Sequence, residues 1–184
     1  MIYDYKEALV EWYAISKKLR RYPRYFVQKP ETNTTWCHIQ TDGKNGICTY
    51  PPPNDPYTYD ILLPEFKGSI IERILNDYNA ANGKIRVMGR NSTCPVHMDH
   101  GHAGENLEGK YTYFFVLQTN EHSFYVVQPE DSDRLPDEDY AWQAYHWKAD
   151  GRVHRIASIR KHAAMNGGST MKIQLQFVSK DDLQ

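Results

Sequence analysis

Residues 171–178 read MKIQLQFV, a stretch in which polar and apolar side chains alternate. Such alternation is typical of a β-strand, because successive side chains point to opposite faces. The stretch is the last of six short runs, rich in β-branched and aromatic residues, that follow residue 83 with turns between them. The runs are Lys84–Gly89, Tyr111–Gln118, Ser123–Gln128, Gln143–Trp147, Arg152–Ile156 and Met171–Val178. Many short, closely spaced strands predict a mainly β sandwich or barrel, and we expect a jelly roll.

The first 83 residues have a different pattern. Apolar side chains at helical spacing predict a helix over residues 4–20, which Pro23 stops. A second helix is predicted from Glu65 to Ala80, and two short strands, Trp36–Gln40 and Gly46–Tyr50, lie between the helices. No repeat or long linker divides the chain. We therefore expect one domain over residues 1–184, with residues 1–83 packed outside a jelly-roll core at 84–178.

Composition excludes several classes of function. The formal net charge is -1, so nothing demands a nucleic acid or an anionic membrane as partner. The longest apolar runs fall far short of the roughly 20 residues that span a bilayer, and the N-terminus lacks a signal-peptide core. Three widely spaced cysteines, an odd number, predict free thiols and a cytoplasmic protein. The 14 tyrosines are explained by packing more readily than by stacking on bases.

Residues 94–100, CPVHMDH, contain the first candidate site. His97 and Asp99 are two positions apart at a predicted strand end, so their side chains point the same way. An imidazole and a carboxylate side by side supply two of the three protein ligands of a non-haem Fe(II) centre. The triplet alone is weak evidence, and a surface His–Asp pair is the alternative.

A second candidate segment begins at His162, where small residues and a predicted turn precede the strand at 171–178. A histidine placed there can return a third ligand to the same site; His154, in mid-strand, is the runner-up. Lys172 lies ten residues beyond His162. If it points into the barrel it needs an anion, such as the C5 carboxylate of 2-oxoglutarate. The alternative is an outward-facing Lys172 with no role.

Together these segments resemble the 2-oxoglutarate/Fe(II) oxygenases, particularly the aspartyl/asparaginyl β-hydroxylase-like branch. The resemblance covers about residues 84–178. It rests on a strand at 86–99 that runs into H-x-D, on a Thr119-Asn120 turn between strands, and on the order H-[small]-x-x-N-x-G, basic residue, alternating strand from His162 onward.

The resemblance implies a double-stranded β-helix, a jelly roll of the cupin kind. It also implies an oxygenase in which His97, Asp99 and His162 bind Fe(II) and Lys172 binds 2-oxoglutarate. The substrate would be an amino-acid or peptidyl side chain, or another small molecule.

The sequence departs from the family pattern in two ways. The basic residue is more often Arg, so Lys172 would make a point-charge contact in place of a bidentate one. The strand before the Thr119-Asn120 turn reads YTYFF and lacks an Arg and a His that often assist co-substrate binding; the phenol of Tyr113 or Tyr111 is the substitute that we expect. The rival interpretation is a cupin-like metal-binding or small-ligand-binding module, or an assembly protein, without 2-oxoglutarate turnover. The sequence reveals neither the substrate nor the oligomeric state.

Overall fold

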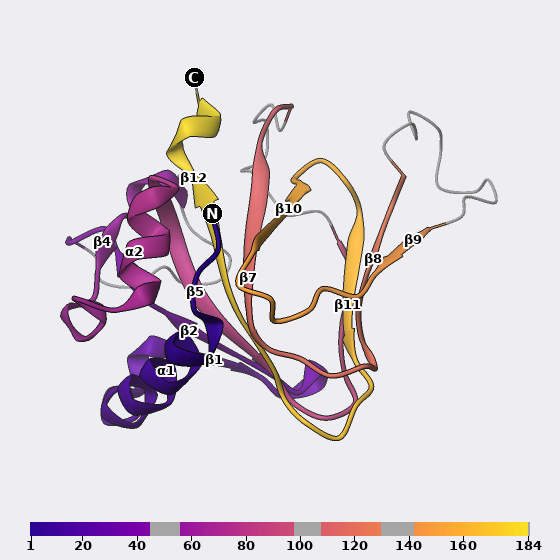
Figure 1. Ribbon diagram of the computed structural model, residues 1–184, viewed down its shortest axis with the longest axis horizontal. Helices are drawn as coiled ribbons and strands as arrows, with labels where there is room; N and C mark the ends of the chain where they lie inside the picture. The colour runs from indigo at the N-terminus through magenta and orange to yellow at the C-terminus, as the bar shows by residue number, and fades with distance from the viewer. Residues whose placement is uncertain (45–55, 98–107, 130–141, 184) are drawn as a thin grey trace.

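Two antiparallel sheets that face each other dominate the computed structural model, which describes residues 1–44, 56–97, 108–129 and 142–183 (Figure 1). The larger sheet has the strand order β1-β2-β5-β12-β7-β10, and the smaller has the order β6-β11-β8-β9. β3 and β4 form a separate short pair. The strands are β1 (Phe26–Lys29), β2 (Thr34–His38), β3 (Gln40–Thr41), β4 (Ile61–Leu62), β5 (Ala80–Met88), β6 (Ser92–His97), β7 (Tyr111–Gln118), β8 (Ser123–Val127), β9 (Gln143–Tyr145), β10 (Val153–Ala157), β11 (His162–Asn166) and β12 (Lys172–Ser179).

The two helices are α1 (Tyr5–Leu19) and α2 (Ile70–Asp77). The predicted helix at 4–20 is confirmed, with Asp4 as its N-cap. The predicted helix at 65–80 is too long at both ends. Gly68 has a φ of 80°, which no helix contains, so α2 starts only after it; Asn79 has a φ of 44°, and β5 begins at the next residue.

Both helices lie on one side of the six-stranded sheet, and the four-stranded sheet lies on the other side (Figure 1). The main apolar core therefore fills the space between the helices and the sheet. We call this helix-covered side the outer face of the sheet. Its core combines residues of both helices and of the turn before α2 with one side of β5, β7 and β12: Ala8, Trp12, Leu19, Phe66, Ile71, Ile74, Ile85, Phe115, Leu117, Ile173, Leu175 and Phe177.

The opposite, or inner, face of the same sheet is mainly polar. The register places Lys172 beside Met88, Gln174 beside Arg86 and Gln176 beside Lys84. On the neighbouring strand β2, Trp36 is in register with Arg86 and His38 is in register with Lys84. Only a small apolar cluster lies between the sheets: Met88, Phe114, Tyr125, Val127, Ile156 and Ala164.

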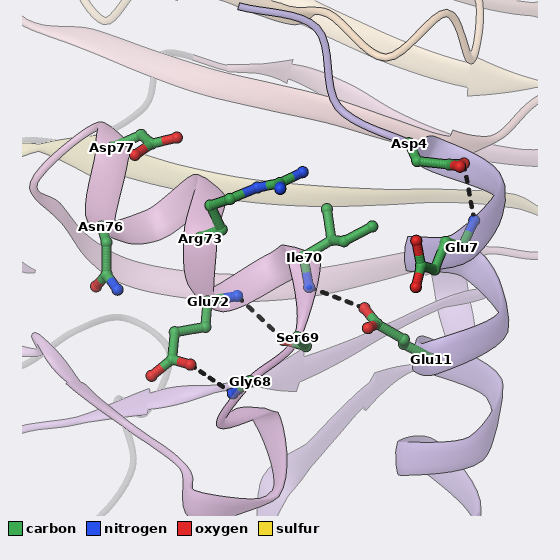
Figure 2. A pocket seen from close by; sticks show the side chains of 10 residues that line it. All are labelled: Asp4, Glu7, Glu11, Gly68, Ser69, Ile70, Glu72, Arg73, Asn76 and Asp77. Atoms are coloured by element: carbon green, nitrogen blue, oxygen red, sulfur yellow. Dashed lines mark hydrogen bonds between the residues drawn. The ribbon is translucent and has the colours of Figure 1, made fainter.

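The two helices start beside each other around an open cleft of about 500 Å³ lined by several carboxylates (Figure 2). Three of these carboxylates accept hydrogen bonds from helix-terminal amides. Glu11 of α1 accepts from the Ile70 amide at 2.9 Å, Glu72 accepts from the Gly68 amide, and Asp4 caps its own helix. Unpaired amides at helix starts favour such acceptors, so these acids are explained as caps.

At one end of the structure, three turns that connect one sheet to the other pack together around Asn166, a fully buried side chain. Its amide donates to the carbonyls of Met88 and Gly89, and its oxygen accepts from Asn120 and Ser123. We call this the closed end of the sandwich. The contacts explain the H-[small]-x-x-N-x-G pattern, because a Cβ at Gly168 would lie 2.1 Å from the Asn120 Oδ1 atom.

Several strand boundaries differ from the sequence-based expectation. The predicted strand at 86–99 is two strands, β5 and β6, which belong to different sheets and are joined by a turn in which Asn91 has a φ of 52°. His162 begins strand β11, although its small neighbours predicted a turn. β1 was not predicted, and the expected strand Gly46–Tyr50 lies outside the described residues.

Two further expectations concern the cysteines and the membrane. Cys37 and Cys94 are free thiols, and Cys48 lies outside the described residues. Within the described ranges, neither helix combines the length and the apolar character that crossing a membrane requires.

Candidate functional site

His97 and His162 are direct neighbours in the smaller sheet. They are register partners on β6 and β11, and their ring centroids lie 4.4 Å apart. His162 is buried, with 2% of its surface exposed, and His97 is half-buried at the end of its strand. The structure thus brings together two of the three predicted iron ligands, at the end of these strands opposite the closed end.

Backbone carbonyls orient both imidazoles in the same manner. The Nδ1 atom of His97 lies 2.8 Å from the carbonyl oxygen of Pro95, and that of His162 lies 3.1 Å from the carbonyl oxygen of Arg160. A carbonyl only accepts, so each Nδ1 must carry the proton and donate it. In the neutral form of such a ring the lone pair lies on Nε2, which is the arrangement of a metal-binding histidine with its second nitrogen fixed by the backbone.

The third predicted ligand, Asp99, lies two residues beyond His97 and outside the described residues. Within residues 1–44, 56–97, 108–129 and 142–183, no group of three His, Cys, Asp or Glu side chains is placed to hold a metal ion. The metal site as predicted from the sequence therefore remains a prediction, of which the structure describes one histidine pair.

Lys172 points into the space between the sheets. It is 1% exposed, and its Nζ lies 4.0 Å from the centroid of the Tyr125 ring on β8, in the opposite sheet. The outward-facing alternative is therefore wrong. Burial, followed by the positive charge of Arg86, lowers the pKa of Lys172 to about 7. A lysine held in this way is destabilised in its charged form and would gain from a bound anion.

Arg86 is the second buried cation between the sheets, at 3% exposure. Its guanidinium carbon lies 4.8 Å from the Trp36 ring centroid, and its Nε has no hydrogen-bond partner. Arg86 also connects to the histidine pair through Cys94, whose Sγ lies 3.7 Å from the Nδ1 of His97. Burial raises the pKa of Cys94, but hydrogen bonds with His97 and Arg86 and their charges outweigh it and lower the pKa to about 7.

Polar side chains line the same space between Arg86 and Lys172. Gln174 is fully buried and donates to the hydroxyl of Tyr125, while its Oε1 has no hydrogen-bond partner. Buried polar atoms without partners are rare in folded proteins. Their gathering here, beside two cations, leaves hydrogen-bonding capacity that a polar ligand or water would satisfy.

Tyr113 does not belong to this pocket. It pairs with Phe177, stacks on its ring at 5.4 Å and donates to Asp182 at 3.0 Å, all on the outer face of the sheet. Because side chains alternate along β7, Phe114 takes the inner face and Tyr113 the outer one. The prediction that Tyr113 binds the co-substrate is therefore wrong.

The runner-up histidine, His154, is engaged elsewhere. It lies on β10, and its ring stacks on Trp147 with centroids 5.0 Å apart. The ring neighbour of His97 is His162. That His162 is the third iron ligand, ranked ahead of His154, remains a prediction.

The sequence did not lead us to Gln174 or Tyr125 as site residues, and Arg86 was only a fallback for holding the co-substrate carboxylate. One signal was present. In β12 the polar residues Lys172, Gln174 and Gln176 alternate with apolar ones, and the neighbouring β5 carries Lys84 and Arg86 in the same way. A polar set of this size on two adjacent strands indicates a lined pocket when both faces of the sheet are covered.

No family model matches this sequence, and comparison with curated proteins finds no match. Among solved structures, an oxidoreductase of the 2OG-Fe(II) oxygenase family from Burkholderia pseudomallei superposes with a TM-score of 0.53 and 17% identity. The match covers 93% of this chain and 77% of that chain. The fold is a cupin-like jelly roll.

Two other solved structures are more distant. The oxalate decarboxylase of Lactobacillus farciminis has a TM-score of 0.46 and 10% identity over 84% of this chain and 30% of that one. The Cnp3 cupin domain of Schizosaccharomyces pombe has a TM-score of 0.38 and 15% identity over 57% and 55% of the two chains. At these levels only the first similarity supports an argument, and it concerns the jelly-roll fold alone. Function must come from the residues of the site.

Proposed function

We propose that this protein is an oxygenase that uses Fe(II) and 2-oxoglutarate, of the aspartyl/asparaginyl β-hydroxylase-like branch. The observation that supports it best is that the histidine pair and the buried Lys172 lie in one jelly-roll interior, each with the chemistry that the family requires. The proposed iron ligands are His97, Asp99 and His162. The proposed substrate is an amino-acid or peptidyl side chain or another small molecule.

The described residues can supply two of the protein ligands of an iron ion. Two imidazoles whose Nδ1 atoms are held by the carbonyls of Pro95 and Arg160 are, in their neutral form, suitable ligands for Fe(II). A carboxylate at Asp99 would complete a facial triad. When bound, Fe(II) and 2-oxoglutarate would react with O₂ to supply the oxidising centre that hydroxylates a C–H bond. One oxygen atom of O₂ would enter the hydroxylated product and the other would enter succinate, with CO₂ released from 2-oxoglutarate.

The protein's own residues would then bind and orient the co-substrate. Lys172 faces the interior from the closed end, and a carboxylate beside it compensates its buried charge. The small apolar cluster around Phe114, Val127 and Ile156 lines the same space and excludes water from it.

The test is an anaerobic titration of the purified protein with Fe(II) and then with 2-oxoglutarate. The readouts are the metal-to-ligand charge-transfer band and, after oxygen is admitted, the succinate formed. Wild type should show both. His162→Ala and Asp99→Ala should lose Fe(II) binding and turnover. His122→Ala is the matched control, because His122 lies exposed on a turn next to Glu121.

The Lys172→Ala variant separates the effect on co-substrate binding from the effect on metal binding. It should keep Fe(II) affinity and lose roughly 30- to 150-fold in 2-oxoglutarate affinity, the equivalent of about 2–3 kcal/mol for a charge-assisted contact. If wild type binds Fe(II) but shows no band and forms no succinate, the oxygenase proposal fails. The rival, a cupin-like binding module or assembly protein, then takes its place.

A further inference from the structure

Arg86 and Lys172 are two cations enclosed by the same pair of sheets. They lie on neighbouring strands, β5 and β12, and both point to the inner face. Their register positions differ by two residues, which corresponds to about 7 Å along the strands. Both are at least 97% buried, with exposures of 3% and 1%.

No carboxylate of the described residues compensates this pair. The charge that acts on Lys172 is that of Arg86, which is repulsive. The contacts of Arg86 are the Trp36 ring and the Cys94 sulfur, and its Nε has no hydrogen-bond partner. Two like charges buried together are unfavourable unless an anion joins them.

The two cations differ in what lies beside them. Arg86 hydrogen-bonds to Cys94, which in turn contacts His97 of the proposed metal centre. Lys172 is in register with Met88, whose carbonyl is bound by Asn166 at the closed end. An elongated ligand between them would have one end near the histidine pair and the other near the closed end.

We propose that Arg86 and Lys172 form one site for a short dicarboxylate, and that Arg86 makes this site prefer a dianion over a monoanion of the same length. Lys172 takes the carboxylate at the closed end, and Arg86 takes the one nearer His97. The Oε1 of Gln174, which has no hydrogen-bond partner, lies in the same row as Arg86 and two residues from Lys172 along β12, where it would accept from water or from a ligand hydroxyl.

The physical reason is charge balance. A monoanion compensates one of the two cations and leaves the other buried without a partner, whereas a dicarboxylate compensates both. Identifying the dicarboxylate as 2-oxoglutarate rests on the proposed function. The preference for a dianion does not, because it follows from residues that are not metal ligands.

The experiment uses the full chain, stripped of metal with EDTA, and compares glutarate with pentanoate by calorimetry and by thermal shift. The two probes have the same number of carbons and differ by one carboxylate. Glutarate should bind roughly 30-fold or more tightly than pentanoate, as expected for one additional charge-assisted contact. Inorganic phosphate, a compact dianion, should bind more weakly than glutarate because it cannot reach both cations.

Arg86→Met and Arg86→Lys make the test specific to this residue. Arg86→Met should reduce the glutarate-to-pentanoate ratio to about one, and Arg86→Lys should keep most of it because the charge remains. Arg90→Met is the matched control, since it removes one positive charge from an exposed position four residues away. A purely structural role for Arg86 would weaken both ligands equally and leave the ratio unchanged.

Several results would overturn the proposal: equal affinity of wild type for the two probes, tighter binding of phosphate than of glutarate, or an unchanged ratio in Arg86→Met. Should Arg86→Met not fold, the wild-type ratio and that of Arg86→Lys still decide the matter. Failure of the oxygenase proposal is distinguishable, because it would appear as absent Fe(II)-dependent turnover in a protein that still prefers glutarate.

Discussion

The outer and inner faces of the six-stranded sheet differ in chemistry although the same strands form both. On β12, Ile173, Leu175 and Phe177 pack against the helices, while Lys172, Gln174 and Gln176 face the second sheet. Neighbouring residues in the chain thus serve different tasks. The outer face supplies most of the apolar burial that stabilises the fold, and the inner face supplies charge and hydrogen-bonding groups.

This division differs from a simple β-sandwich, whose core is the layer between its two sheets. Here that layer is partly polar, and the helices provide the apolar partner instead. Along one strand, a residue that faces the helices therefore contributes to stability, and the next residue, which faces the second sheet, contributes to binding. The two faces should respond differently to substitution, and the following experiments test this from the largest effect to the smallest.

Removing a large outer-face side chain should be the most damaging change. Phe115 is fully buried in the helix-covered core and packs edge-on against Tyr3. Phe115→Ala should lower the free energy of unfolding by about 3–5 kcal/mol, as measured by urea denaturation. The inner-face counterpart Gln176→Leu should cost little, because the Oε1 of Gln176 has no partner. Equal losses would mean that the two faces do not divide these tasks.

Lys172→Met should stabilise the ligand-free protein. The pKa of Lys172 is about 7 in the folded state and 10.5 in the unfolded chain, so between pH 10.5 and 7 the unfolded chain binds a proton that the folded protein does not. Stability of wild type therefore falls as the pH drops from about 10.5 to about 7. At pH 7 the variant should be more stable by on the order of 4 kcal/mol. Denaturation of both proteins between about pH 7 and 10 is the measurement, and parallel pH profiles would contradict this prediction.

His38 should lower the stability of the folded protein in the acid range. It is buried on the inner face, and burial, followed by the charge of Lys84, lowers its pKa from 6.5 to about 3. The unfolded chain is then protonated first, so stability is lost as the pH falls from about 6.5 toward about 3. His38→Gln should remove this loss, worth about 2 kcal/mol at pH 5. Thermal unfolding at pH 7 and pH 5 measures it, and a variant as acid-sensitive as wild type would refute it.

Among these substitutions, Tyr113→Phe should have the smallest effect on stability and no effect on co-substrate binding. It removes the hydrogen bond from the Tyr113 hydroxyl to Asp182 on the outer face, worth about 1 kcal/mol of unfolding free energy. Affinity for 2-oxoglutarate should match wild type in the same anaerobic titration in which Lys172→Ala loses binding. A drop in co-substrate affinity for Tyr113→Phe would show that the outer face takes part in binding.

The contrast between Lys172 and Tyr113 shows what the sequence could predict. In MKIQLQFV the alternation is visible, so Lys172 and the two glutamines were certain to share a face. In YTYFFVLQ both faces of β7 are buried, so the sequence carries no period-two signal and the orientation of Tyr113 could not be derived.

Which face looks inward depends on tertiary structure. An alternating strand alone would direct Ile173, Leu175 and Phe177 into the barrel and Lys172 outward. The helices reverse this, because they cover the apolar face and leave the polar one between the sheets. The need of an inward lysine for an anion suggested the correct orientation. Arg86 was a fallback for holding the co-substrate carboxylate, and the register of β5 with β12 is what places it on the same face as Lys172.

The position of β12 has a consequence for the order in which the protein can fold during synthesis. Among the described strands β12 comes last in sequence, yet it lies in the middle of the six-stranded sheet between β5 and β7. Until residues 172–179 leave the ribosome, β5 and β7 each have an unpaired edge, the kind of surface that invites pairing with other chains. The nascent chain should therefore depend on chaperones until β12 has been synthesised. Premature termination shortly before residue 172 should yield aggregates and no partly active fragment.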